Sequence, residues 1–267
     1  MKNVKTTMIA SAIALSCGAG NVLADSWIIV QEANLNTNAT TLTQNANGST
    51  GAASSVQAIN NINLGSDGVI DTGSTQTLNT SQAITFDQDN AGADNIQAVN
   101  NAVTPTVTDL TQTLTSSAAQ TIKFEQGIDG AIGTGNVQAV NRVKATTVTK
   151  LSQTISGSAN TTLDFDQGSL TATNAIQAGN LIDASTAGDT VSDANVSQTV
   201  DVLASNMEQN LTTASLQANN ALITPTTGGT AGGGGITQTF TNGTLTMLQS
   251  GTNGSYQSGN YVGVTPW

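Results

Sequence analysis

The chain has 267 residues, a formal net charge of -11, and only 3% aromatic and 9% charged residues. It contains no histidine, and its single cysteine is Cys17, so the usual Ser-His-Asp, Cys-His and zinc arrangements cannot form. Its six Lys and Arg argue against a nucleic-acid partner, because that affinity depends on cations that neutralise phosphates. We therefore expect a non-enzymatic protein with no cofactor, no metal and no small-molecule substrate.

Residues 1–24 have the pattern of a secretory signal peptide. Lys2 and Lys5 supply a positive start, and Met8 to Leu15 supply an apolar stretch too short to cross a bilayer. Val22-Leu23-Ala24 then offers a cleavage site with small residues. The alternative is a lipid-anchoring cysteine at Leu15-Ser16-Cys17-Gly18. We expect a secreted protein, extracellular or on a bacterial cell surface, whose mature chain has no thiol and an acidic surface.

Residues 25–260 form a single domain of six repeat units of about forty residues, at approximately 25–65, 66–106, 107–147, 148–190, 191–228 and 229–260. Each unit contains three segments centred on glutamine. The first segment reads apolar-Thr/Ser-Gln-Thr-apolar, as in Leu110 to Leu114. Its glutamines are Gln31, Gln76, Gln112, Gln153, Gln198 and Gln238.

The second segment ends in apolar-x-Gln, as in Ile122 to Gln126, and the third reads apolar-Gln-Ala-x-Asn, as in Val137 to Asn141. The second contributes Gln44, Gln88, Gln126, Gln167, Gln209 and Gln249. The third contributes Gln57, Gln97, Gln138, Gln177, Gln217 and Gln257, together with Asn60, Asn100, Asn141, Asn180, Asn220 and Asn260. The glutamines of the third segment recur at intervals of 39 to 41 residues, a regularity that chance does not produce.

All three segments alternate with period two, which indicates strands and excludes a helical face. Turn-rich connections such as Asn90 to Asp94 separate them. Because a three-strand unit cannot bury its apolar face alone, neighbouring units must stack. The sequence therefore predicts an all-β, solenoid-like or β-helix-like stack, although it leaves open whether each unit makes one layer or two.

Stacking would place equivalent residues about 4.8 Å apart, so that glutamine lies over glutamine in amide ladders. Such a buried hydrogen bond contributes about 1 kcal/mol, whereas an unpaired buried amide costs about 1–3 kcal/mol, and this asymmetry enforces the register. One large apolar residue per unit fills the core beside the amides. These predicted core residues are Leu42, Phe86, Phe124, Phe165, Met207 and Met247.

Phe165-Asp166-Gln167-Gly168, followed by Asn174-Ala175-Ile176-Gln177, resembles the curlin repeat of curli-type bacterial functional amyloids. The likeness recurs at Phe124 to Gly127 with Asn136 to Ala139, and more loosely in the other four units. The resemblance implies an exported subunit that polymerises into extracellular fibrils for adhesion or a biofilm matrix. It also implies that the ladder Gln and Asn residues govern assembly, and that outer-membrane export or nucleation machinery is a partner.

The open edges of such a stack predict head-to-tail self-assembly, because an unpaired edge templates the addition of another chain. No charged or proline-rich capping segment is evident before Ser26 or after Gln257. The acidic surface would keep the fibres apart laterally. Residues 261–267 form a C-terminal tail that we interpret as a cap or as an assembly or export element.

Other interpretations remain open. One alternative is a monomeric surface-binding solenoid, either an adhesin or an ice-binding protein. It is suggested by the pairs Thr75/Thr77, Thr111/Thr113, Ser152/Thr154, Ser197/Thr199 and Thr237/Thr239, although Thr is also a common outward-facing strand residue.

Three further alternatives rest on acidic residues or on strand alternation. Acidic loops such as Asp87 to Asn90 suggest calcium binding, but no complete ligand loop is present. Asp164 and Asp166 suggest a glycosidase pair, yet equivalent positions vary. An outer-membrane barrel would need more aromatic residues.

Overall fold

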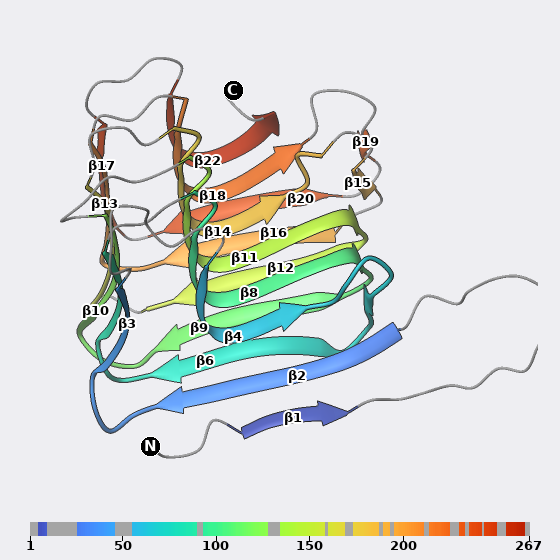
Figure 1. Cartoon of the computed structure of the whole chain (residues 1–267), viewed down its shortest axis with the longest axis horizontal. Coiled ribbons are helices and arrows are strands. Elements are labelled where there is room, and N and C mark those ends of the chain that lie inside the picture. The colour runs from blue at the N-terminus through green and yellow to red at the C-terminus, as the bar shows by residue number, and fades with distance from the viewer. Residues whose placement is uncertain are drawn as a thin grey trace, which may run out of the picture.

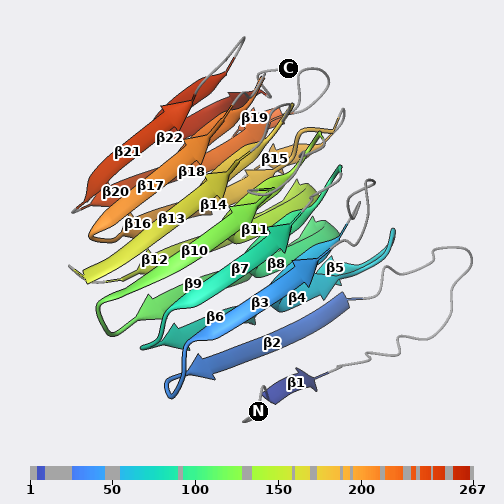
Figure 2. The same cartoon turned by 60° about the vertical axis from the view of Figure 1, so that its left-hand side comes forward.

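In the computed structural model, the chain forms parallel β-sheets that wind into a solenoid, which confirms the predicted fold class (Figures 1 and 2). The structure describes residues 5–9, 26–45, 55–89, 93–127, 134–157, 160–168, 173–186, 189–192, 195–210, 214–224, 230–232, 235–241, 243–249 and 255–264. These residues contain no α-helix. The predicted cleavage site and residues 265–267 lie outside the described residues.

Each of the three glutamine segments forms its own stack of strands, and each stack contains one strand from every repeat unit. The first stack is β2 (Ser26–Leu35), β6 (Ser74–Thr80), β9 (Leu110–Ser116), β12 (Lys150–Ser156), β16 (Asn195–Asp201) and β20 (Ile236–Thr241). The second stack is β3 (Thr40–Asn45), β7 (Ile84–Asp89), β10 (Gln120–Gln126), β13 (Thr161–Gln167), β17 (Ala204–Gln209) and β21 (Thr244–Gln249). The third stack is β4 (Val56–Asn63), β8 (Ile96–Val107), β11 (Val137–Val148), β14 (Ile176–Asp183), β18 (Leu216–Thr224) and β22 (Tyr256–Val264).

Strands within a stack are parallel and pair each residue with its equivalent in the next unit. Phe124 pairs with Phe86 on one side and with Phe165 on the other. Each repeat unit therefore makes one layer, which we call a rung. The first rung is β2, β3 and β4, and the last rung is β20, β21 and β22. The predicted tail begins inside β22, because this strand continues to Val264.

Four short strands complete the sheets. β5 (Val69–Ile70), β15 (Thr190–Ser192) and β19 (Thr230–Gly232) extend the third-stack sheet, and β5 also pairs with β2. β1 (Lys5–Ile9) pairs antiparallel with β2 and occupies its outer edge. Because β1 lies inside the predicted signal peptide, removal of residues 1–24 would leave that edge free.

The strands of the third stack bend midway, so the cross-section of the solenoid has two arms (Figure 1). Their first halves pack against the second stack, where Val140 joins a buried cluster with Phe124 and Phe165. Their second halves pack against the first stack, where Val143 joins a cluster with Leu110 and Leu151. The adjacent residues Val140 and Asn141 are both fully buried, which breaks the period-two alternation at the bend.

Candidate functional site: the amide columns and the end rungs

The glutamines of the first stack form one continuous column of side-chain hydrogen bonds through all six rungs. Gln76 Nε2 donates to Gln31 Oε1 at 2.8 Å, and Gln112 Nε2 donates to Gln76 Oε1 at 2.7 Å. The same step, from each rung to the one before it, continues through Gln153, Gln198 and Gln238 at 2.7–2.8 Å. Gln76, Gln112, Gln153 and Gln198 are fully buried.

The other two glutamine columns have the same direction. In the second stack, Gln126, Gln167, Gln209 and Gln249 each donate to the glutamine of the preceding rung, at 2.8–3.2 Å. The backbone of Gln44 pairs in register with Gln88, and its side chain lies outside the described part of the structure. In the third stack, Gln97, Gln138, Gln177, Gln217 and Gln257 donate in the same way, beginning at Gln57.

The asparagine column runs in the opposite direction. Asn60 Nδ2 donates to Asn100 Oδ1 of the next rung at 2.7 Å, and this step repeats through Asn141, Asn180, Asn220 and Asn260. The predicted ladder residues with described side chains are thus brought together. Four columns of aligned amides, three in one direction and one in the other, extend along the solenoid axis.

The second N–H of many of these amides bonds a backbone carbonyl across the interior. Gln112 Nε2 donates to the carbonyl of Arg142, Asn141 Nδ2 to that of Thr154, and Gln138 Nε2 to that of Asp166. These bonds tie the third stack to the first and to the second. Each buried amide therefore fixes the register along the axis and the packing across it, and its loss would leave several buried groups unpaired.

The predicted core residues line the arm between the second and third stacks. Phe86, Phe124 and Phe165 are fully buried and stack face to face, with ring centroids 4.8 and 4.9 Å apart. Met207 continues this column and is 1% exposed, whereas Leu42 and Met247, on the first and last rungs, are only partly buried. The large apolar column is therefore complete inside the stack and open toward its ends.

At the last rung, side chains that face the core remain exposed. Ile236 is 37% exposed, Val262 51% and Val264 44%, although the residues equivalent to Ile236 and Val262 on inner rungs, such as Leu151 and Val143, are fully buried. Within the described part of the chain, the strands β20, β21 and β22 each end their sheets with an unpaired edge. At the other end, β3 and β4 are terminal strands, and β2 carries β1.

The ends of the columns also leave complementary polar atoms. No described residue donates to Oε1 of Gln238, Gln249 or Gln257, whose nitrogens point back into the stack. Asn260 Nδ2 makes one bond, to the carbonyl of Gln238. On the first rung, Gln31 Nε2 donates once, to the carbonyl of Asn61, while Asn60 Oδ1 accepts from no described donor.

The outer face of the first stack carries the predicted threonine columns in register. The longer column runs Thr77, Thr113, Thr154, Thr199 and Thr239, following Glu32 of the first rung. The neighbouring column has serine on two rungs, at Ser152 and Ser197. This face thus presents a regular array of hydroxyl and methyl groups.

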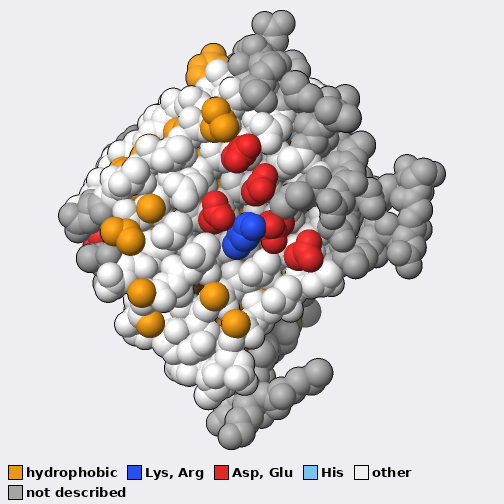
Figure 3. Space-filling view, turned by 90° about the vertical axis from the view of Figure 1, so that its left-hand side faces the viewer, with side chains coloured by type: hydrophobic (Ala, Val, Ile, Leu, Met, Phe, Trp, Pro, Cys, Tyr) orange, Lys and Arg blue, Asp and Glu red, His pale blue; other side chains and the backbone are white. Residues whose placement is uncertain are grey.

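The outer face of the second stack carries an acidic column around a single lysine (Figure 3). Asp87, Glu125, Asp166 and Glu208 occupy one position on four successive rungs. Lys123 Nζ lies 2.5 Å from Glu125 Oε1, and this hydrogen bond is the largest effect that raises the pKa of Lys123. Burial raises the pKa of Asp166, with a further increase from Glu208, and burial likewise raises the pKa of Asp164.

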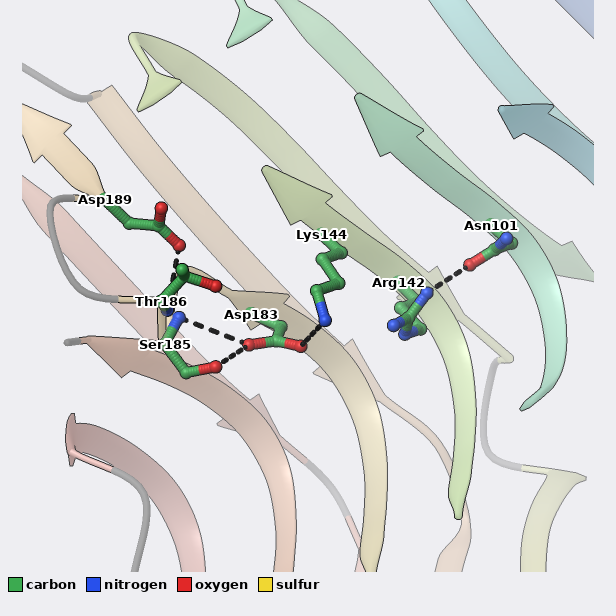
Figure 4. A network of polar contacts seen from close by, with 7 residues as sticks. All are labelled: Asn101, Arg142, Lys144, Asp183, Ser185, Thr186 and Asp189. Carbon is green, nitrogen blue, oxygen red and sulfur yellow. Dashed lines mark hydrogen bonds and ion pairs between the residues drawn. The ribbon is translucent and has the colours of Figure 1, made fainter. Parts of the chain in front are cut away.

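Three polar features were not found by the sequence reasoning. The first is a column of asparagine side chains just before the third-stack strands. The backbone N–H of Ser55 donates to Asn95 Oδ1, and the backbone N–H of Asn95 donates to Asn136 Oδ1. Arg142 is 4% exposed and bonds Asn101 (Figure 4). Asn219 is fully buried, and neither of its side-chain polar atoms has a hydrogen-bond partner. The signal for Arg142 was a charged residue where other units have a neutral one, and the signal for Asn219 was a polar residue where other units have a small or apolar one.

Among the described residues, no three Asp, Glu, His or Cys side chains lie together so that they could hold a metal ion. The described part of the chain also has no helix that is long and apolar enough to cross a membrane. Comparison with known proteins found no matching family model, no matching curated protein and no matching solved structure.

Proposed function

We propose that this protein is the subunit of a head-to-tail polymer, secreted and assembled outside the cell. The observation that carries the proposal is that four amide columns run through the stack, and that the first-stack glutamine column and the asparagine column finish at its two ends in complementary atoms. A second chain stacked on the last rung would continue these two columns by the same step that already repeats inside the molecule. Because buried unpaired amides cost about 1–3 kcal/mol each, such continuation favours addition of a rung over an open end.

The direction of the columns supports a polar polymer. The last rung presents Oε1 of Gln238 and an N–H of Asn260, and the first rung presents an N–H of Gln31 and Oδ1 of Asn60. When the first rung of one chain stacks on the last rung of another, these donors meet these acceptors. If the last rungs of two chains stacked on each other, the glutamine oxygens would face one another. This arrangement is unfavourable because each oxygen would meet an acceptor and not a donor.

Apolar surface and unpaired backbone support the same contact. The exposed Ile236, Val262 and Val264 occupy core positions, and a docked first rung would cover them. The free edges of β20, β21 and β22 would pair with β2, β3 and β4 of the next chain in the register already used within the stack. Because β1 occupies the edge of β2, we expect the chain without residues 1–24 to polymerise faster.

The biological role follows from the curlin-like repeats, which suggest fibrils for adhesion or a biofilm matrix. Self-association is then the main interaction, with export or nucleation machinery as a further partner. The net charge of -11 would limit lateral bundling of such fibres at low salt. On this proposal the protein is a structural material and not an enzyme.

Electron microscopy and fibre diffraction of the purified chain, with and without residues 1–24, test the proposal. We expect unbranched fibrils with a meridional reflection near 4.8 Å, from strands perpendicular to the fibre axis. A chain that stays monomeric at high concentration, in both forms, would contradict polymerisation.

A matched pair of variants tests the contact. Val262→Lys places a charge in the open core of the last rung, whereas Thr246→Lys places the same charge on the outer face of that rung. We expect Val262→Lys to stop its own elongation and to inhibit wild-type chains at substoichiometric amounts, because its first rung still docks onto a growing end. Thr246→Lys should polymerise normally. Equal polymerisation of the two variants would exclude this interface.

A second candidate function is binding to a regular surface such as ice, through the threonine columns of the first stack. The favouring observation is the unbroken column from Thr77 to Thr239, in which threonines repeat once per rung. A thermal-hysteresis assay on the monomer tests it, with Thr113→Lys as the disrupting variant. Absence of hysteresis in the wild-type monomer would remove this candidate.

A further inference from the structure

The bend in the third stack creates a hollow on the outside of the solenoid, away from the amide columns. Its cavity has a volume of about 520 Å³, within the usual range for small-molecule sites. One end of the cavity lies at the bend, where Arg142, Lys144 and Asp183 line it. The other end lies at the strand starts, where Asp94 and Asn174 line it.

Arg142 is the anomalous group in this hollow. The equivalent positions on the other rungs are neutral: they are Asn61, Asn101, Leu181, Ala221 and Tyr261. Arg142 is only 4% exposed, yet it makes no ion pair with any described carboxylate, and its Nε has no hydrogen-bond partner. Its one described hydrogen bond runs from Nη1 to Asn101 Oδ1, at 2.9 Å.

The nearest carboxylate is already engaged. Asp183 Oδ1 accepts from the hydroxyl of Ser185 at 2.6 Å, and Asp183 Oδ2 lies 3.8 Å from Lys144 Nζ (Figure 4). Asp183 acts on Arg142 only through space, and burial outweighs this effect and lowers the pKa of Arg142. A buried cation without a direct partner is unfavourable, so the hollow has an unmet requirement for an anion at the bend.

The walls between the two ends are apolar. Ile96, Val103, Val137, Ile176 and Ile223 line the same cavity. A guanidinium group presents a planar fork of donors that matches a carboxylate, and these branched side chains favour an apolar body behind it. We propose that the hollow binds a small organic carboxylate with an apolar body, held by Arg142 at the bend.

This site is independent of polymerisation, because it lies on the outer side of inner rungs and not at either end. A ligand here would contact β8, β11, β14 and β18 at once, and would therefore stabilise the stack through ligand linkage.

Isothermal titration calorimetry of the full-length chain with hexanoate tests the proposal, with acetate and hexanol as probes that lack the apolar body or the charge. We expect one hexanoate per chain and at least tenfold weaker binding of acetate and of hexanol. Arg142→Leu should lose hexanoate binding by tenfold or more. Leucine is already tolerated at the equivalent Leu181, so this variant should fold, and circular dichroism would verify it.

Lys150→Leu is the matched control, because it removes one positive charge at an exposed ion pair with Asp109, away from the hollow. We expect this variant to bind hexanoate like the wild type. The proposal is overturned if hexanoate does not bind, if Arg142→Leu binds it as tightly as Lys150→Leu does, or if acetate or hexanol binds as tightly as hexanoate.

Discussion

The rung formed by β9, β10 and β11 and the last rung carry the same side-chain pattern but differ in burial. Gln112, Phe124 and Val143 are fully buried on the inner rung. On the last rung, the equivalent Gln238 and Met247 are half-buried and Val262 is 51% exposed. The difference shows that a rung does not bury its own core. Each neighbour supplies one half of the cover, as expected for a quasi-one-dimensional repeat protein.

The largest effect should come from removal of an inner aromatic ring. Phe124→Ala would leave a cavity between Phe86 and Phe165, and we expect it to lower the free energy of unfolding by about 3–5 kcal/mol. Met247→Ala on the last rung should cost about 1–2 kcal/mol, because that side chain is already partly in water. Urea unfolding of the monomer measures both. Similar losses would mean that the last rung is covered in solution.

We expect the amide columns to show the same difference between inner rungs and the last rung. Gln112→Leu would leave Gln76 Oε1 and one N–H of Gln153 unpaired in the interior, and would remove the bond to the carbonyl of Arg142. We expect it to lower the free energy of unfolding by about 3 kcal/mol, whereas Gln238→Leu should change it by about 1 kcal/mol or less. If both variants unfold at the same urea concentration, the amide columns do not determine stability.

Much of this organisation was predicted from the sequence, because a forty-residue period with glutamine at three fixed positions leaves few arrangements. The three stacks, the strand register and the amide columns follow from that periodicity. The period alone could not show one layer per unit, since the identity of equivalent residues does not reveal how a unit folds. Pairing of Phe124 with Phe86 and Phe165 settles that point.

The bend in the third stack was missed, although a signal was present. In every unit Gln and Asn are three residues apart, as in Gln138 and Asn141, which would put them on opposite faces of a straight strand. Both point inward because the strand bends between them. The hollow that contains Arg142 exists only because of this bend, so a prediction from alternation alone could not find it.

A smaller, stabilising effect is expected at Asn219. This side chain lies between Gly179 and Gly259 in the column that has Val99 and Val140 on inner rungs, and its amide has no partner. Asn219→Val should therefore raise the free energy of unfolding by about 1–2 kcal/mol. Thermal unfolding measures the change. A destabilised Asn219→Val would indicate that the amide is hydrogen-bonded in solution, for example to a buried water molecule.

The smallest effect should be a dependence of stability on pH from the outer face of the second stack. Burial raises the pKa of Asp164 and Asp166 above the usual value of 3.8, so the native state binds protons more tightly than the unfolded chain does. Their contribution to stability is fully present below pH 3.8 and is lost as the pH rises through their native pKa values. The melting temperature should therefore increase slightly as the pH falls from 7 toward 4.

The double variant Asp164→Asn, Asp166→Asn separates this face from the rest of the molecule. It should be more stable than the wild type at pH 7, and its melting temperature should depend less on pH between 7 and 4. Some dependence should remain, because burial also raises the pKa of Asp189. Below pH 4 the loss of the hydrogen bond from Ser26, which lowers the pKa of Asp71, should act in the opposite direction. An unchanged pH dependence in the double variant would contradict this prediction, because it would show that solvent screens the charges of Asp164 and Asp166 and that their burial does not affect stability.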